Sequence, residues 1–323
     1  MSKLTYIEAL RLALKEEMRK DKDVFVLGED ISRYGFGVCR GLLEEFGKER
    51  VRNTPISEAA IIGAAIGAAL RGMKPVAEIM FVDFSLVAMD QIVNQAAKMI
   101  YLSNGELDLP LVIRAPEGTE WHGGGCQHSQ TLHSIFTNIP GLKIVIPSNP
   151  YDAKGLLKTA IQDRNPVLFF EHKQLYTQKS EVPEEEYTIP FGKADIKREG
   201  DDITLIATSW MVTHALDVAE ELKNEVSIEV VDPRTLVPLD RETIISSVKK
   251  TGRVLVVDES PVTGGIQGEI ISTIMEEAFW NMEVPPMRLG SQNTPVPFSA
   301  PLEEEVIPTK KRIKEAILKM VST

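Results

Sequence analysis

The sequence has few cysteines, few aromatic residues and no long uninterrupted apolar run. Its two cysteines, Cys39 and Cys126, lie in different parts of the chain, which excludes a disulfide framework and a paired-cysteine zinc site. The longest apolar stretch, residues 59–70, is broken by glycines and is too short to span a bilayer. An apolar signal core is missing and acidic residues occur early, so we expect a cytoplasmic protein, unless a matrix presequence was removed.

Positive charge is also scarce relative to negative charge. The chain has 36 Lys and Arg against 47 Asp and Glu, which gives a formal net charge of -11. Nucleic acid and anionic membranes would be repelled by such a surface, so neither is expected as a partner. With 323 residues, 43% of them hydrophobic, the chain is long enough for two cored domains, because single cores rarely grow beyond about 250 residues.

Short β-rich runs alternate with helical patterns along the chain. A first helix is expected after Thr5, where Glu8 completes a capping box. Strands are then predicted at 24–27, 75–80, 109–114, 142–146, 167–170, 203–208, 226–231, 254–257 and 287–289, with helices between them and a last helix from about residue 309. The alternation predicts an α/β protein with open, mostly parallel, doubly wound sheets.

A polar, acidic stretch with two prolines, EVPEEEYTIPFGKADIKREG, interrupts this alternation. Its composition is typical of an inter-domain linker. We therefore predict a first domain over residues 1–180, a linker over 181–200 and a smaller α/β domain over 201–323.

A carboxylate at the start of a small-residue helix is the first candidate site. The segment TPISE, residues 54–58, leads into AAIIGAAIGAAL. Glu58 could take part in chemistry, or it could stabilise the positive end of the helix while Ser57 caps it. Both interpretations are compatible with the residues alone.

A glycine-rich loop from Gly118 to Gln130 is the second candidate site, because it follows a predicted strand and open α/β sheets bind ligands at the carboxyl ends of their strands. His128 is the strongest candidate for a catalytic residue in this loop, since imidazole can transfer a proton near neutral pH. For His122 and His133 we favour surface or structural roles. Zinc is not expected in this loop, which offers His122, Cys126 and His128 without a fourth ligand.

Seven ordered segments, spread over nearly the whole chain, resemble a known family. They are VFVLGED (24–30), FGKERVRNTPISE (46–58), DQIVNQAAK (90–98), QHSQ (127–130), PGLKIVIPSNPYDAKGLL (140–157), VDPRTLVPLD (231–240) and TGRVLVVDESPVTGG (251–265). Together they resemble the beta subunits of the decarboxylase components of pyruvate, branched-chain 2-oxo acid and acetoin dehydrogenases. The resemblance implies a transketolase-like pyrimidine-binding domain followed by a transketolase C-terminal-like domain.

The resemblance implies thiamine diphosphate as cofactor and gives roles to individual residues. The position of Glu58 matches a glutamate that hydrogen-bonds the pyrimidine ring and favours its imino tautomer. Ile56, Met80 and Phe84 match positions that pack around this ring, although each could equally be a plain core residue. His128 matches a histidine that faces the cofactor intermediate and the incoming lipoyl group, which implies a role in proton donation and orientation during acyl transfer.

The resemblance further implies a monovalent cation, potassium, and a partner subunit. Potassium would be held by backbone carbonyls at Leu111, Ala160 and Ile161 with Asp163 and Asn165, although a helix C-terminal turn there needs no ion. The chain lacks the family's Gly-Asp-Gly segment for magnesium and diphosphate. An alpha subunit is therefore expected to hold magnesium and the diphosphate in a two-alpha, two-beta heterotetramer that docks on the lipoyl acyltransferase core.

The implied activity is oxidative decarboxylation of a 2-oxo acid with acyl transfer to a lipoyl group, an oxidoreductase reaction. Cleavage of acetoin, half of a split transketolase and a noncatalytic assembly subunit are alternatives. Two loops, residues 30–42 and 118–126, differ from the usual pattern of the family, and both bear on substrate choice and lipoyl access. The sequence leaves pyruvate, branched-chain 2-oxo acids and acetoin open as substrates.

Overall fold

The protein forms two compact units in the computed structural model, which describes residues 1–33, 36–119 and 124–322. The first unit comprises Met1–Glu117 and Ile135–Phe191, and the second comprises Gly118–Ser134 and Gly192–Thr323. The segment that contains His128 therefore groups with the second unit, although first-unit residues flank it in sequence.

The first unit is built on a parallel sheet. Its strands are β2 (Val24–Glu29), β3 (Val51–Thr54), β4 (Lys74–Glu78), β5 (Val112–Glu117), β6 (Lys143–Val145) and β7 (Val167–His172), in the order β6-β7-β5-β4-β2-β3. A separate antiparallel pair joins β1 (Ser2–Thr5) to β8 (Lys179–Val182). All neighbouring strands within the sheet of this unit run parallel, as the alternating pattern predicts.

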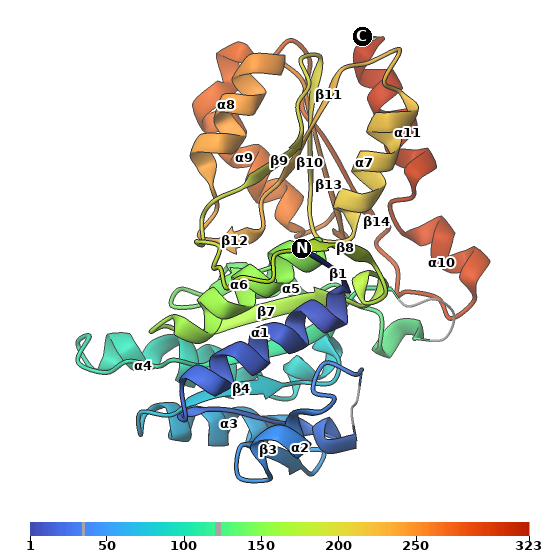
Figure 1. The fold of residues 1–323 in the computed structure, drawn as a ribbon. Helices are drawn as coiled ribbons and strands as arrows, with labels where there is room; N and C mark the ends of the chain where they lie inside the picture. The colour runs from blue at the N-terminus through green and yellow to red at the C-terminus, as the bar shows by residue number, and fades with distance from the viewer. Residues whose placement is uncertain (34–35, 120–123, 323) are drawn as a thin grey trace. The chain divides into compact units, whose positions relative to one another are not determined.

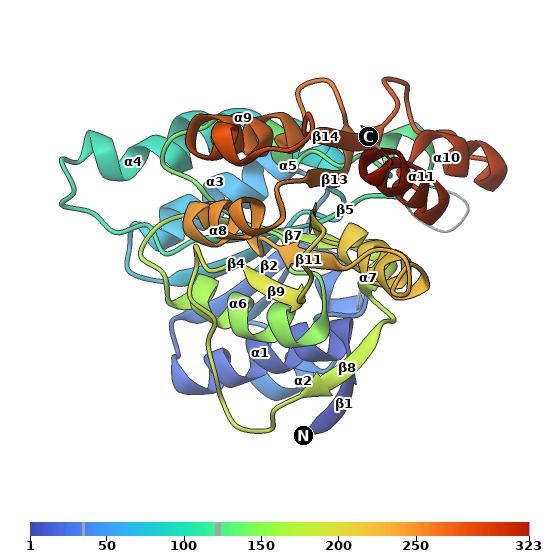
Figure 2. The same ribbon diagram turned by 90° about the horizontal axis from the view of Figure 1, so that it is seen from above.

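Helices cover both faces of this sheet. They are α1 (Tyr6–Lys20), α2 (Leu42–Phe46), α3 (Glu58–Ala69), α4 (Ala97–Leu102), α5 (His133–Thr137) and α6 (Pro150–Gln162), with a π-helix at Gln91–Ala96 and 3-10 turns at Ile31–Arg33, Val82–Leu86 and Lys173–Leu175. Figure 2 shows α1 and α6 on one face of the sheet and α3 on the other. The unit is thus doubly wound.

The capping box predicted for the first helix is present in α1. The Glu8 backbone N–H donates to the Thr5 hydroxyl at 3.2 Å, and the Thr5 backbone N–H donates to the Glu8 carboxylate at 2.8 Å. Leu10 and Leu14, one helical turn apart, are fully buried where α1 packs against α6. Sequence periodicity therefore predicted both the start of this helix and its buried face.

The second unit repeats the architecture on a smaller scale. Its sheet has the order β14-β13-β10-β11-β9, with β9 (Asp195–Arg198), β10 (Ile203–Ala207), β11 (Ile228–Asp232), β13 (Val254–Pro261) and β14 (Met287–Ser291). Only β9, at the edge, runs antiparallel to its neighbour in this sheet of described residues. The unit also contains β12 (Thr235–Val237), α7 (Met211–Glu221), α8 (Arg241–Thr251), α9 (Ile266–Ala278), α10 (Ala300–Val306), α11 (Lys310–Val321) and 3-10 turns at Gly125–Gln127 and Phe279–Asn281.

Helices also cover both faces of the second sheet. Figure 1 shows α8 and α9 on one face and α7 and α11 on the other. The core between α7, α11 and the sheet is formed by fully buried side chains such as Leu205, Val230, Leu255 and Ile313. The predicted fold class, two open and mostly parallel doubly wound sheets, is confirmed.

The segment predicted as a linker, residues 181–200, contains regular structure. The last residues of β8 and all of β9 lie within it, and the two compact units divide between Phe191 and Gly192. Backbone pairing of β9 with β11 is independent of side-chain alternation, which is why the polar composition concealed it. In the part of the chain that the structure describes, no helix is both long and apolar enough to cross a membrane.

Burial of His214 predicts a pH-dependent stability. His214, on α7, is 8% exposed and lies against Trp210 with ring centroids 4.4 Å apart. Burial lowers its pKa to about 4 from an ordinary 6.5, although a contact with the Pro308 carbonyl acts in the opposite direction. Between these pH values the unfolded chain binds a proton that the folded chain does not, so stability falls as pH falls from 6.5 to 4.

We therefore expect His214→Gln to flatten the pH dependence of stability between pH 7 and pH 4.5. The His214 contribution approaches about 3 kcal/mol over its full window. Urea unfolding at several pH values measures the effect on wild type and variant. Parallel curves for the two proteins would contradict the assignment.

Candidate functional site

Glu58 is the first residue of α3 and is 9% exposed. Ser57 occupies the N-cap position but its side chain makes no capping hydrogen bond, so the interpretation in which Ser57 caps this helix is wrong. The Glu58 carboxylate lies at the positive end of the helix dipole, which favours a negative charge. The local backbone therefore holds a largely buried carboxylate at the start of α3.

A second acidic residue, Glu29, lies close enough to Glu58 for their charges to interact. Strand β2 ends at Glu29, and Asp30 follows in a left-handed backbone conformation with φ of 49°. Burial raises the pKa of Glu29, and the neighbouring charges of Asp30 and Glu58 raise it further. Our sequence reasoning did not assign Glu29 or Asp30 to the site. Their position at the carboxyl end of a parallel strand was the available signal.

The three apolar residues predicted to surround a ligand ring differ in exposure. Ile56 is 75% exposed, so in this chain it is not a core residue, whereas Met80 and Phe84 are half-buried. The Phe84 ring meets Phe81 edge-on, with centroids 5.8 Å apart, and Phe81 meets Phe36 in the same way at 5.2 Å. Phe84 thus belongs to a row of aromatic rings with Phe81 and Phe36. That these residues pack around a pyrimidine stays a prediction.

A buried ion cluster lies beneath the carboxyl edge of the first sheet. The Arg114 guanidinium, 1% exposed, donates to Glu78 at 2.5 Å and to both oxygens of Glu171 at 2.6 and 2.9 Å. The Tyr176 hydroxyl donates to Glu171 at 2.9 Å. Burial raises the pKa of Glu171 more than the facing Arg114 lowers it. A sequence signal for this cluster was available but not used: a charged residue interrupts each of the otherwise apolar strand segments PVAE, VIRAP and LFFEH.

His128 lies in the second unit, in a loop whose two ends meet at Gly118 and Gln130, a pair that we call the neck of the loop. The Gly118 N–H donates to the Gln130 carbonyl at 2.9 Å, which brings the two limbs of the loop together. A 3-10 turn at Gly125–Gln127 precedes His128, whose side chain is partly exposed. Gly118 and Gly125 have φ of +82° and +60°, a region that favours glycine. The bulky segment 120–122, which includes His122, and Tyr34 and Gly35 in the other unusual loop lie outside the described residues.

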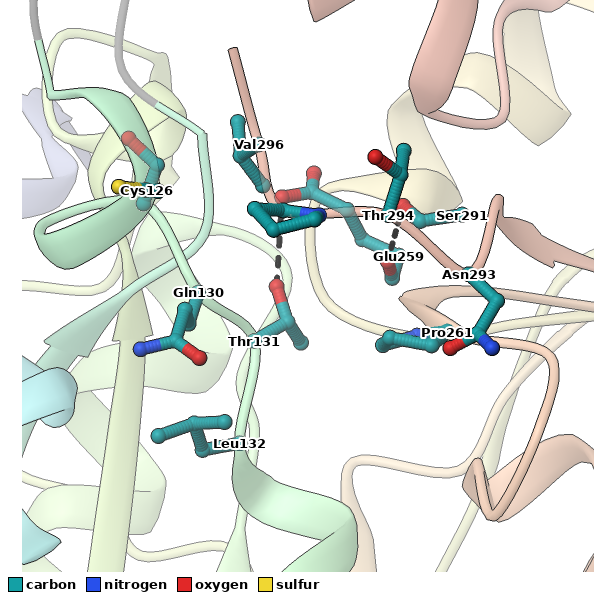
Figure 3. Close-up of a pocket in the computed structure, with 12 residues that line it drawn as sticks. Cys126, Gln130, Thr131, Leu132, Glu259, Pro261, Ser291, Asn293, Thr294 and Val296 are labelled. Carbon is teal, nitrogen blue, oxygen red and sulfur yellow. Dashed lines mark hydrogen bonds between the residues drawn. The ribbon is translucent and has the colours of Figure 1, made fainter.

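A pocket of about 400 Å³ opens beside this loop in the second unit (Figure 3). It is lined by Cys126, Ser129, Gln130, Thr131, Leu132, Glu259, Pro261, Ser291, Asn293, Thr294, Pro295 and Val296. Among these lining residues Glu259 alone is charged, and it is 5% exposed. Such a pocket favours a neutral or positively charged group over an anion.

The end of strand β13 contacts the loop through buried polar groups. His133 Nε2 lies 2.9 Å from Asp258 Oδ2, and the Thr208 hydroxyl donates to the same oxygen at 2.7 Å. Burial alone would raise the pKa of Asp258, but His133 and these hydrogen bonds lower it to about 2. His133 is 1% exposed, so a surface role is wrong for it, and the structural role that we favoured stays a prediction.

The residues predicted to hold potassium lie at the end of α6 and beside β5. The Ala160 carbonyl accepts the Asp163 N–H at 3.3 Å, and the Leu111 carbonyl accepts the Val167 N–H at 2.8 Å. Ile161 is 3% exposed. Burial raises the pKa of Asp163, but hydrogen bonds from Lys143 and Asn165 outweigh it, and the net pKa is lowered.

These contacts bear on how a cation could bind. The Asp163 carboxylate is engaged by the Lys143 ammonium and by the Asn165 N–H and side-chain amide, at 2.9 and 2.8 Å for the latter two. A carbonyl oxygen has two lone pairs, so Leu111 and Ala160 can still accept an ion. The geometry is compatible with a turn that needs no ion and with a carbonyl-bound cation. Potassium stays a prediction.

Within residues 1–33, 36–119 and 124–322, no group of three or more His, Cys, Asp or Glu could hold a metal ion. The site residues thus fall into two groups: Glu58, Ile56, Met80 and Phe84 in the first unit, and His128 in the second.

Two family profiles match the chain and together span most of it. Residues 2–179 match the profile described as "Transketolase, pyrimidine binding domain", and residues 192–313 match "Transketolase, C-terminal domain". Glu58 and the apolar residues around it fall in the first match. A solved structure titled "Split gene transketolase, inactive beta4 tetramer" is similar over 99% of this chain and 98% of its own, with a TM-score of 0.80 and 24% identity. That likeness supports the fold.

Curated relatives are similar over nearly the full length. The "2-oxoisovalerate dehydrogenase subunit beta" of Bacillus subtilis (strain 168) is 48% identical, with 98% of both chains covered. An "Acetoin:2,6-dichlorophenolindophenol oxidoreductase subunit beta" of the same organism is 44% identical, over 97% of this chain and 96% of the relative. The "Pyruvate dehydrogenase E1 component subunit beta" of Porphyra purpurea is 45% identical, over 100% of this chain and 98% of the relative.

The buried ion cluster predicts a large cost for removing its one cation. Arg114→Met leaves Glu78 and Glu171 buried without a compensating charge, and we expect a loss of about 3 to 5 kcal/mol of unfolding free energy. Urea unfolding monitored by circular dichroism measures it. Arg164→Met is the matched control, because Arg164 pairs with Asp108 at 2.6 Å but on the surface, with its side chain 77% exposed. Similar losses in both variants would contradict the prediction.

Proposed function

The chain belongs to the transketolase-like beta subunits of the E1 components of 2-oxo acid dehydrogenases, and from this membership we propose its reaction and its site. We propose that it takes part in thiamine-diphosphate-dependent oxidative decarboxylation of a 2-oxo acid, with acyl transfer to a lipoyl group. The observation that supports this best is Glu58, a largely buried carboxylate at the start of α3 inside the region that matches a pyrimidine-binding domain.

Glu58 is suited to form a hydrogen bond with the pyrimidine ring of the cofactor. When bound, thiamine diphosphate supplies an acidic thiazolium carbon and an electron sink for the decarboxylation. A Glu58 carboxylate oxygen would accept a hydrogen bond from the pyrimidine ring of the bound cofactor, and it would hold a proton there and so favour the imino tautomer. Ile56, exposed in this chain, and the half-buried Met80 and Phe84 provide apolar surface for the ring.

His128 serves the later step of acyl transfer. Its imidazole is partly exposed, next to a glycine-containing turn and a pocket lined by neighbouring residues. Imidazole can donate a proton near neutral pH, so His128 donates a proton to the lipoyl group and orients it. The lipoyl group is supplied by the acyltransferase core of the complex.

Partner chains complete the site. The sequence lacks the Gly-Asp-Gly segment with which the family holds magnesium and diphosphate, so an alpha subunit holds both in a two-alpha, two-beta heterotetramer. Potassium, if bound, is held by the carbonyls of Leu111, Ala160 and Ile161 near Asp163 and Asn165. We place the assembly in the cytoplasm.

Cleavage of acetoin is the second candidate reaction. The relative named as an acetoin oxidoreductase beta subunit is 44% identical, close to the 48% of the 2-oxoisovalerate dehydrogenase subunit. Pyruvate and branched-chain 2-oxo acids differ by a few methyl and methylene groups, each of which a pocket discriminates by only about 1 to 3 kcal/mol, whereas acetoin differs from both in lacking the carboxylate. The three substrates are distinguished by co-expressing this chain with its alpha subunit and measuring the activity of the assembled enzyme on each substrate with an artificial electron acceptor.

We expect Glu58→Gln to lower decarboxylation by about 10²- to 10³-fold while the heterotetramer still forms, because the amide cannot hold the proton at the pyrimidine ring. Activity is measured with an artificial electron acceptor after assembly with the alpha subunit, and assembly by size-exclusion chromatography. Glu8→Gln is the matched control, since Glu8 is also an acid in the first turn of a helix. Retained activity in the Glu58 variant would remove the proposed relay.

We expect His128→Ala to lower acyl transfer to a lipoyl domain by roughly 10²-fold, which is the usual contribution of one general acid. Cofactor affinity and decarboxylation with an artificial acceptor should change by less than about 3-fold, because neither step uses this proton. The control is His214→Gln, which removes a buried histidine of the same unit. Equal damage to cofactor binding and acyl transfer would count against the role of His128.

A further inference from the structure

Three consecutive residues at the end of β13 bind the segment that contains His128. Asp258 pairs with His133, and the Ser134 hydroxyl donates to the Ser260 hydroxyl at 3.3 Å. Ser134 is fixed in turn, because the Ile266 N–H donates to its hydroxyl at 3.0 Å. These contacts hold the C-terminal side of the segment to the start of α9.

Glu259 lies between Asp258 and Ser260 in the sequence, and one of its carboxylate oxygens binds both ends of the loop. Its Oε1 accepts the Thr119 N–H at 2.7 Å and the Thr131 hydroxyl at 3.3 Å. Both donors adjoin the neck, where the Gly118 N–H meets the Gln130 carbonyl. A single carboxylate oxygen therefore ties together the two ends of the loop.

The environment of Glu259 makes this contact rigid. Its side chain is 5% exposed, and its own carbonyl accepts the Ser291 hydroxyl at 2.5 Å, which fixes the backbone beneath it. Figure 3 shows the Glu259 side chain extending between Thr131 and Val296 in the pocket. Charge-assisted hydrogen bonds of this kind are about twice as strong as neutral ones. Without the carboxylate, the Thr119 N–H would be buried and unsatisfied.

We propose that Glu259 is a positioning residue for acyl transfer: by clamping the neck of the loop it fixes His128, two residues from Gln130. The proposal rests on the proposed role of His128. It gives Glu259 no contact with the reacting atoms. The carboxylate acts only through the path of the loop, so a group that accepts the same hydrogen bonds should replace it.

The test compares Glu259→Ala with Glu259→Gln in the assembled complex with the alpha subunit. Gln keeps a carbonyl oxygen that can accept from Thr119 and Thr131, whereas Ala removes the acceptor. We expect Glu259→Ala to lower acyl transfer to a lipoyl domain at least 10-fold, with decarboxylation changed less than about 3-fold. Glu259→Gln should stay within about 3-fold of wild type in both reactions.

A double variant separates positioning from a general structural role. In the His128→Ala background, Glu259→Ala should cause no further loss of acyl transfer, because residues that act as a unit are non-additive. Asp240→Ala is the matched control, since Asp240 is also a buried carboxylate of the second unit that accepts backbone N–H groups, from Ala194 at 2.9 Å and Thr243 at 3.1 Å. That control should leave the ratio of the two reactions unchanged.

Two outcomes would overturn the proposal, and they are distinguishable. If His128→Ala leaves acyl transfer unchanged, the role of His128 fails and the clamp has nothing to position. If His128→Ala has its expected effect but Glu259→Ala spares acyl transfer, adds to the loss in the double variant or lowers decarboxylation equally, the proposal for Glu259 alone is wrong.

Discussion

The ion cluster around Arg114 is the interaction on which the first unit depends. Its guanidinium joins three adjacent strands, because Glu78 ends β4, Arg114 lies in β5 and Glu171 lies in β7. Buried charges are costly unless they are paired and hydrogen-bonded, so the three side chains must keep one arrangement. The carboxyl edge of the sheet is thereby held rigid, and this is the edge at which open α/β folds bind ligands.

In the second unit too, buried charged side chains hold separate parts of the chain together. There the charged residues Asp258 and Glu259 lie in the last half of strand β13 and bind a loop, whereas the cluster of the first unit binds neighbouring strands. A loop with glycines at positive φ has backbone freedom that must be lost before it can hold a side chain in place. The fixed carboxylates supply that order, and His128 lies within the segment that they bind.

The local features were predictable because they depend on residues close in sequence. The capping box of α1, the start of α3 at Glu58 and the succession of parallel strands follow from periodicity and turn chemistry. Our predictions were less complete where side-chain alternation is weak. The edge strand β9 lies in the polar segment predicted as a linker, because strand pairing there is made by backbone groups.

The sequence by itself determined the fold class, the family and the residues that belong to its motifs, because ordered motifs and hydrophobic periods are properties of the chain. Only the tertiary structure decided which distant side chains meet: Arg114 with two glutamates, and Glu259 with the neck of the loop. The physical reason is burial. A charged residue inside an apolar strand must find a partner once water is excluded, and the order of the strands determines which partner it finds.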